Sequence, residues 1–153
     1  MYNVIVSEQI GSAQALRLDA QLCFALYSAN NTLGRAYQAL LEPLDLTYLQ
    51  YITMMALWEQ DGVRVKDLGD RLRLDSGTMT PLLKRLQGKG LLERTRSAED
   101  ERVVLINLTR KGRGLKRRAA RVPAALSCKF DLTLEEALQL KHLCERLVEG
   151  AEL

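Results

Sequence analysis

Two short runs of apolar residues at helical spacing stand close together in the middle of the chain. The first lies within residues 65–73 and the second within residues 78–88, and only a few residues separate them. So short a gap leaves room only for a tight corner between two packed helices, which is a helix-turn-helix. The apolar positions are Val65, Leu68, Leu72, Met79, Leu82, Leu83 and Leu86.

Two strand-like segments follow the second run directly. Leu91 to Thr95 and Val103 to Leu108 are rich in Leu, Val and Ile, and a charged loop from Arg96 to Arg102 joins them. A helix-turn-helix followed by such a hairpin makes a winged helix. The expected fold is therefore mostly α-helical with a small β-hairpin wing.

The ends of these two helices are marked unevenly. The first, residues 65–73, has no good capping side chain at its start. Asp75, Ser76 or Thr78 can begin the second, which ends at Gly88 or Gly90. Since proline is tolerated without loss only in a first turn, Pro81 favours a regular helix that begins near Thr78.

Longer amphipathic helices are expected before the winged helix. Asp19 is expected to cap a helix that runs to about Glu42, where Pro43 ends it. Thr47 and Gln50 form a capping box, which opens a second helix through Trp58 that Asp61-Gly62 closes.

Two further helices are expected after the wing. Thr109 begins a basic helix weakened by Gly112, Gly114 and Pro123, and a capping box from Thr133 to Glu136 opens the last helix. The outer helices carry more apolar surface than a small winged helix can cover, so they predict a homodimer. One domain results, with N-terminal dimerisation helices at 19–59, the winged helix at 64–112 and C-terminal dimerisation helices at 113–153.

Charge is distributed unevenly along the chain. Residues 64–118 hold 16 Lys and Arg against 7 Asp and Glu, a net of +9, whereas the remainder has a net of −6. A basic winged helix favours double-stranded DNA as the partner, and the alternative is an ordinary solvated charged face. A dimer would read a palindromic operator in successive turns of the duplex.

Polar residues of the second short helix and of the wing are the candidate DNA contacts. Hydroxyl groups at a helix N-terminus can reach bases or phosphates, and a lysine can neutralise a phosphate; the alternative, strongest for Ser76, is that the hydroxyls only cap the helix. A wing arginine can enter a narrow minor groove, and Asp100 is expected to hold an arginine in position. The candidates are Ser76, Thr78, Thr80, Lys84, Arg94, Arg96, Asp100 and Arg102.

Composition narrows the other classes of function. The chain start carries no convincing export signal, and no apolar run reaches the length of a membrane span, so the expected location is cytoplasmic, with no membrane partner. Three cysteines without a CxxC pair argue against a disulfide framework, and with a single histidine, His142, neither a zinc site nor a hydrolytic triad is expected. No cofactor and no enzyme activity are predicted.

The order of helices, the wing with Asp100-Glu101-Arg102 and the following LTRKG at Leu108 to Gly112 resemble the MarR family of transcription regulators. The resemblance covers nearly the whole chain. Within the family, the segments at residues 18–31, 44–59 and 74–86 are similar to the OhrR-type organic hydroperoxide sensors, including an N-terminal cysteine, Cys23.

The resemblance implies roles for particular residues. Cys23 would be the peroxide-reactive thiol, and Tyr37 and Tyr48 of the partner subunit would hydrogen-bond to it. Some members resolve the oxidised cysteine with a C-terminal cysteine of the other subunit, and others use small thiols; Cys128 is favoured over Cys144 for that role. Without the resemblance, Cys23 would be interpreted as a small buried thiol with no chemistry.

Three hypotheses follow from the sequence. The first is a repressor that organic hydroperoxide releases from DNA through an intersubunit link between Cys23 and Cys128. The second is a repressor of the same fold that responds to a small aromatic ligand, with the cysteines incidental. The third is a thiol peroxidase, which would leave the basic winged helix unexplained.

Overall fold

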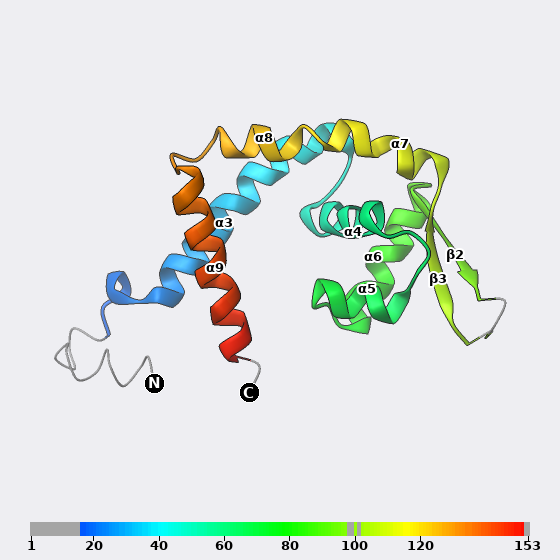
Figure 1. Ribbon diagram of the computed structural model, residues 1–153, viewed down its shortest axis with the longest axis horizontal. Coiled ribbons are helices and arrows are strands. Elements are labelled where there is room, and N and C mark those ends of the chain that lie inside the picture. The colour runs from blue at the N-terminus through cyan, green and yellow to red at the C-terminus, as the bar shows by residue number, and fades with distance from the viewer. Residues whose placement is uncertain (1–15, 98–99, 101, 152–153) are drawn as a thin grey trace. The chain divides into compact units, whose positions relative to one another are not determined.

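The computed structural model describes residues 16–97, 100 and 102–151 (Figure 1). The chain divides into two compact units, one up to Ala39 and the other from Leu40 onward. The elements in order are η1 (Leu18–Ala20), α3 (Leu22–Leu41), η2 (Glu42–Leu44), α4 (Tyr48–Glu59), β1 (Val63–Arg64), α5 (Val65–Leu72), α6 (Ser76–Gly88), β2 (Leu92–Arg96), β3 (Val104–Leu108), α7 (Arg110–Ala119), α8 (Val122–Ser127) and α9 (Leu134–Ala151). The fold is mostly helical with a small antiparallel sheet, as predicted.

The first long helix, α3, begins later than the sequence suggested. Asp19 does not cap it, because Asp19 lies in the short 3-10 helix η1 and its carboxylate binds the guanidinium of Arg17 at 2.7 Å. The helix starts at Leu22 and ends at Leu41, and Pro43 then forms part of η2. The expected end near Pro43 is confirmed. The expected start was wrong because Arg17, two residues before Asp19, binds the Asp19 side chain.

Helix α4 forms the centre of the winged helix. Its capping box is confirmed: Gln50 N–H donates to Thr47 Oγ1 at 3.3 Å, and Thr47 N–H donates to Gln50 Oε1 at 3.1 Å. Met54 and Leu57 are almost completely buried. The hydroxyl of Thr53, which is also fully buried, donates to the carbonyl of Leu49 at 2.7 Å, so no polar group of this side chain is left unpaired.

The helix-turn-helix consists of α5 and α6. No side chain caps α5, as expected. Helix α6, however, begins at Ser76 and not near Thr78, because the Asp75 carboxylate caps it, with a distance of 2.9 Å from the N–H of Thr78. Pro81 therefore lies inside the helix, at an exposed position where its ring costs one backbone hydrogen bond.

A three-stranded antiparallel sheet supports the wing. The strand order is β1-β3-β2, and β2 pairs with β3 from Leu92 opposite Leu108 to Arg96 opposite Val104. The two predicted strands are confirmed to within one residue at each end. Strand β1, which pairs with β3 through Val63 and Ile106, was not predicted, since two residues are too few to show an alternating pattern.

The helices after the wing match the capping signals. Thr109 caps α7 by accepting the N–H of Gly112 at 3.0 Å. The helix ends at Ala119, and Pro123 lies in the first turn of the short α8. The predicted capping box of the last helix is confirmed, with Glu136 N–H donating to Thr133 Oγ1 at 3.3 Å and Thr133 N–H donating to Glu136 Oε2 at 2.8 Å.

The core of the second unit lies beneath the sheet and between the helices of the winged helix. The largest side chains that are almost fully buried come from α4, α6, the two long strands and the end of α3: Leu41, Met54, Leu57, Met79, Leu83, Leu86, Leu92 and Ile106. Four of the apolar positions in the helix-turn-helix pattern, those of α6, are all buried. The period read from the sequence therefore identified the correct face of this helix.

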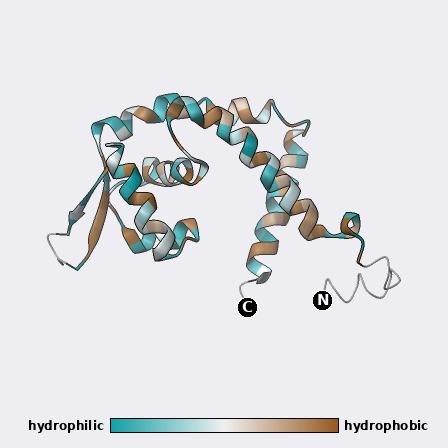
Figure 2. Ribbon diagram, turned by 180° about the vertical axis from the view of Figure 1, so that it is seen from behind, coloured by the Kyte–Doolittle hydropathy of each residue, from teal (hydrophilic) through white to brown (hydrophobic). Residues whose placement is uncertain are grey.

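Two helices expose much apolar surface within the single chain. Figure 2 shows hydrophobic positions recurring along α9, where Leu140, Leu143 and Leu147 are each about half exposed. Helix α3 likewise exposes Leu22, Phe24 and Leu33. No helix in the described ranges is long and apolar enough to cross a membrane.

Candidate DNA-binding surface and thiol residues

A groove of about 650 Å³ lies between α5, the N-terminal half of α6 and the two strands of the wing. Four of the predicted DNA contacts line it: Ser76 and Thr80 from α6, Arg94 from β2, and Arg102 beside β3. Helix and wing residues that are distant in sequence thus lie around one concave surface. Such a groove offers hydroxyl and guanidinium donors to a strand of nucleic acid.

The hydroxyl groups of α6 are used differently from one another. Thr78 donates its hydroxyl to Asp75 at 3.0 Å and so belongs to the helix cap, whereas Thr80 donates to the carbonyl of Ser76 at 2.9 Å. Ser76 is exposed and does not cap α6, since Asp75 does. Hydrogen bonds from the Thr78 N–H and then from its hydroxyl lower the pKa of Asp75, so the cap remains charged at neutral pH.

Lys84 and Arg96 are exposed but lie outside the groove lining. Lys84 comes one turn after Thr80 on α6, on the same side of the helix. Arg96 ends β2, at the start of the wing loop. These two cations extend the basic surface beyond the groove, along the helix and toward the wing tip.

Two contacts hold the wing arginines. Arg94 Nε donates to Gln87 Oε1 at 2.8 Å, which joins the wing to the end of α6. Asp100 Oδ1 accepts the backbone N–H of Arg102 at 2.9 Å, and the Asp100 carbonyl accepts the N–H of Val103. Asp100 therefore positions Arg102 through the backbone of the turn. The neighbouring loop residues 98, 99 and 101 lie outside the described part of the chain.

The groove also contains residues that sequence reasoning did not select. Arg64 and Lys66, at the junction of β1 and α5, add two cations to the lining, beside the acidic Asp67 and Asp70. Both cations contribute to the net charge of +9 over residues 64–118, but that sum did not single them out. Nothing in the spacing indicated that the start of α5 would lie against the wing, because that contact depends on the unpredicted strand β1.

Asp61 ties the base of the wing to the helices. Its Oδ1 accepts the N–H groups of Leu108 at 2.7 Å and Gly62 at 2.9 Å, and its Oδ2 binds Arg113 at 2.5 Å. Partial burial is the largest single influence and acts to raise the pKa of Asp61, but these bonds together lower it below its ordinary value. Their contribution to stability is therefore present above pH of about 4 and is lost as the pH falls further.

The three cysteines differ in position and exposure. Cys23 lies in the first turn of α3 and is exposed in the single chain. Cys128, which follows the last residue of α8, is also exposed, and Cys144 on α9 is half-buried. No cluster of three or more metal-binding side chains occurs among the residues described.

The two tyrosines assigned to the thiol site are on two helices. Tyr37 lies half-buried on α3, two to three turns after Phe24 and Tyr27, which stack with ring centroids 6.5 Å apart. Tyr48 is the first residue of α4 and is exposed. Cys23 and Tyr37 belong to the first unit, and Tyr48 and Cys128 to the second.

Comparison with known proteins places these features in a family. Residues 35–119 match the family model described as transcriptional regulator SarA/Rot. The chain is 49% identical over 131 residues to the HTH-type transcriptional regulator TtmR of Methylorubrum extorquens, covering 86% of this chain and 67% of that protein. It is 42% identical over 134 residues to the organic hydroperoxide resistance transcriptional regulator of Bacillus subtilis, covering 88% of this chain and 91% of that one.

Solved structures of AbfR from Staphylococcus epidermidis have the same fold. Reduced AbfR bound to DNA matches with a TM-score of 0.78 at 30% identity, over 92% of this chain and 96% of AbfR. Overoxidised AbfR bound to DNA matches at 0.73 and 30%, over 88% and 95%, and disulfide-formed AbfR at 0.63 and 29%, over 98% and 95%. The relatives are transcription regulators and not enzymes.

Proposed function

Because this chain belongs to the MarR family of winged-helix transcription regulators, and within it to the OhrR type, we propose that it is a homodimeric repressor that organic hydroperoxide releases from DNA. The observation that carries the proposal is the exposed Cys23 in the first turn of α3, in a chain 42% identical to an organic hydroperoxide regulator. The proposed effector step is oxidation of this thiol.

Duplex DNA is the proposed partner of the groove between α6 and the wing. The N-terminal turn of α6 would enter a major groove, where Ser76 and Thr80 contact bases or phosphates and Lys84 neutralises a phosphate. Arg94, Arg96 and Arg102 would follow the backbone into the adjacent minor groove. Thr78 and Asp100 serve as positioning residues, because their side chains are engaged in the helix cap and the wing turn.

Dimerisation is proposed for the helices on either side of the winged helix, residues 19–59 and 113–153. The exposed leucines of α9 and the apolar residues of α3 supply surface that a single chain leaves in water. Two copies related by a twofold axis would present two α6 helices to a palindromic operator.

The proposed chemistry begins with the Cys23 thiolate. Its sulfur attacks the terminal oxygen of the hydroperoxide, the O–O bond breaks, and the departing oxygen takes a proton to give an alcohol; the sulfur is oxidised to a sulfenic acid. Cys23 is the second residue of α3 and is exposed in the single chain. Tyr37 and Tyr48 of the partner subunit are the proposed hydrogen-bond donors to this sulfur.

The oxidised sulfur is proposed to be resolved by Cys128 of the partner subunit. The thiol of Cys128 attacks the sulfenic sulfur, water leaves, and an intersubunit disulfide forms. Cys128 is exposed just after α8, whereas Cys144 is half-buried on α9, so Cys128 is the more accessible nucleophile. The new covalent link would change the separation of the two α6 helices and lower affinity for DNA.

Non-reducing gel electrophoresis tests this pairing. Treatment of the parent protein with cumene hydroperoxide is expected to give a covalent dimer that a reductant returns to monomer, because Cys23 and Cys128 come from different subunits. Cys128→Ser should give no covalent dimer, and the matched variant Cys144→Ser should still give one. A dimer that disappears in Cys144→Ser and persists in Cys128→Ser would reverse the assignment, and a small-thiol adduct in place of any dimer would refute it.

Removal of one wing cation tests the DNA interface. Arg102→Ala is expected to weaken operator binding about tenfold, the loss of one phosphate or minor-groove contact. The slope of log affinity against log salt should also fall in magnitude by about one. Fluorescence anisotropy over a salt series measures both quantities. Arg146→Ala, an equal loss of charge on α9, should leave them unchanged, and equal effects of the two variants would contradict the proposed interface.

A further inference from the structure

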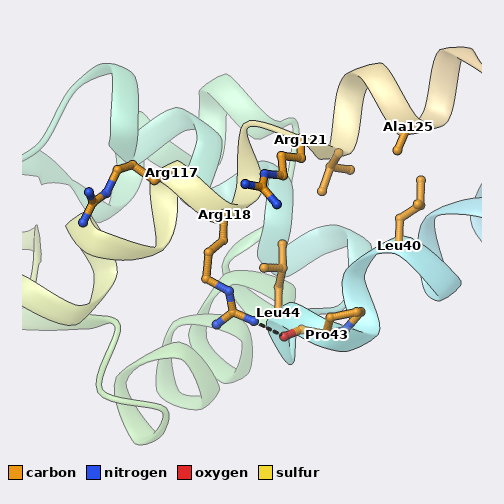
Figure 3. A pocket seen from close by; sticks show the side chains of 8 residues that line it. Leu40, Pro43, Leu44, Arg117, Arg118, Arg121 and Ala125 are labelled. Atoms are coloured by element: carbon orange, nitrogen blue, oxygen red, sulfur yellow. Dashed lines mark hydrogen bonds between the residues drawn. The ribbon is translucent and has the colours of Figure 1, made fainter.

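The basic helix α7 and its junction with α8 carry seven cations between Arg110 and Arg121 and no acidic residue. Four of these cations have partners within the chain: Lys111 with the Lys89 carbonyl, Arg113 with Asp61, Lys116 with the Trp58 carbonyl and Arg118 with the Pro43 carbonyl. Figure 3 shows Arg118 reaching Pro43 while Arg117 points away from it. Among the described residues, Arg110, Arg117 and Arg121 have no ion pair and no side-chain hydrogen bond.

These three arginines lie on one side of the helix. Positions 110, 114, 117 and 121 are spaced by four, three and four residues, and the backbone stays right-handed helical through Ala120 and Arg121, so this side continues across the junction. The buried residues Gly112, Leu115, Ala119 and Val122 occupy the opposite side. The exposed residues Arg110, Gly114, Arg117 and Arg121 are together called the arginine face.

The charges of the arginine face do not stabilise the helix. Arg110 is in the first turn, where a cation opposes the helix dipole, and that turn holds no acidic residue. Arg117 and Arg121 are four positions apart, a spacing at which like charges repel. In α9, by contrast, Lys141 pairs with Glu145 at the same spacing. Because local rules are typically broken where a site serves a function, the arginine face is a candidate for binding.

The arginine face is separate from the groove between α6 and the wing. None of its residues lines that groove. In Figure 1, α7 lies along the upper edge of the winged helix, whereas α5 and the start of α6, which line the groove, lie at the lower edge. A duplex held in the groove would thus leave the arginine face of the same chain unoccupied.

The spacing of the guanidinium groups indicates an extended polyanion. The helix rises by about 16 Å from Arg110 to Arg121, so a small anion meets only one of the two. The arginine face contains no aromatic side chain on which the bases of a single strand would stack, and no apolar side chain that would enter a lipid surface. Duplex DNA presents one phosphate charge for about every 1.7 Å of its axis, and guanidinium groups suit phosphate oxygens.

We propose that the arginine face holds a second segment of duplex DNA by its phosphates, so that a dimer bound to its operator brings another duplex beside it. The inference rests on the proposed function only in taking the protein to be held by an operator, and it requires neither Cys23 nor a particular base sequence. Three phosphate contacts predict a slope of log affinity against log salt of about −2.7, which is a loss of about 40-fold between 50 and 200 mM salt.

Capture of a second duplex by the operator complex tests the proposal. The protein is loaded in reducing buffer on immobilised operator DNA, unbound protein is washed away, and a labelled duplex without the operator is added at about 50 mM salt. The parent is expected to capture the labelled duplex with the predicted slope. Arg117→Gln should lower the affinity for this duplex about tenfold and the magnitude of the slope by about one. Lys129→Gln, an equal loss of charge at an exposed position outside both surfaces, should change neither.

A substitution at the centre of the arginine face provides a second test with a control of the same size. Gly114→Glu places a carboxylate between the arginines and should abolish capture, whereas Gly114→Gln should retain it, since nothing lies within 4 Å of a Cβ atom at this position. The amount of protein held on the operator is measured for every variant, which distinguishes failure to bind the operator from failure to capture a second duplex.

Two sets of results would overturn the proposal. The first is no capture by operator-bound parent protein, or equal capture by the parent, Arg117→Gln and Gly114→Glu. The second is equal capture of a labelled single strand, or competition by polyglutamate as effective as that by duplex DNA at the same concentration of charge. Either result of the second set would assign the arginine face to polyanions in general or to an acidic protein.

Discussion

Replacing Gly112 with alanine is expected to lower the free energy of unfolding by about 3 kcal/mol. Gly112 lies in the first turn of α7, and a Cβ atom there would be 2.0 Å from the carbonyl oxygen of Leu91 and 3.2 Å from Leu108 Cδ2. The same Leu91 oxygen accepts the N–H of Thr109 at 3.1 Å, so it belongs to the junction between β2 and α7. Backbone would have to move, and with it the contact between Trp58 Nε1 and the Gly112 carbonyl.

Gly114 provides a matched control two residues further along the same helix. Nothing lies within 4 Å of a Cβ built there, so Gly114→Ala should be neutral or stabilise the protein by about 0.5–1 kcal/mol through helix propensity. Urea denaturation of both variants at one protein concentration measures the difference, since the stability of a dimer depends on concentration. Equal stability of the two variants would show that α7 does not pack tightly against Leu91.

Local signals in the sequence identified most of the elements. The capping boxes at Thr47 and Thr133 need only residues three positions apart, and both are present with the expected partners. The apolar positions of α6 likewise follow from helical spacing alone, and all of them are buried. Features set by one uncontested local signal are therefore predictable without knowledge of the fold.

Two kinds of feature were missed. Where two local signals compete, the pattern did not decide between them: Asp19 has the residue type of a cap but binds Arg17, and Pro81 suggested a late helix start that Asp75 overrides by capping. Features that depend on distant partners were missed as well. Strand β1 exists only because β3 lies beside it. The sequence singled out Gly112 as part of a family motif and as a weak point in a helix, yet its close approach to Leu91 requires the packed structure.

The candidate DNA surface was only partly predictable for the same reason. Charge and position on a helix selected residues that can reach a phosphate, and four of them do line one groove. The sequence could not reveal that the Thr78 hydroxyl is engaged by the cap, nor that Arg64 and Lys66 lie beside the wing. Both facts follow from the geometry of the α5–α6 corner and the pairing of β1 with β3.

Cys23→Ser is expected to abolish the response to organic hydroperoxide while leaving DNA affinity close to that of the parent. A serine hydroxyl retains the size of the side chain, but it is not a thiolate and does not attack the O–O bond. The parent protein should lose about 10- to 100-fold in operator affinity after treatment with cumene hydroperoxide, which is the usual range of coupling between two sites. Fluorescence anisotropy with a labelled palindromic operator measures the loss, and addition of a thiol reductant should restore binding.

Cumyl alcohol, the reduction product of cumene hydroperoxide, distinguishes oxidation of the thiol from binding of a ligand. It has the same aromatic ring but no O–O bond. A repressor that senses an aromatic ligand should therefore respond to both compounds, with or without Cys23. A redox sensor should respond to the hydroperoxide alone and only while Cys23 is present, and Cys144→Ser should behave as the parent does. Release of the Cys23→Ser protein by either compound would refute the thiol mechanism. The proposed DNA contacts would remain, because the winged helix requires no cysteine, and the protein would be a regulator that responds to a bound ligand.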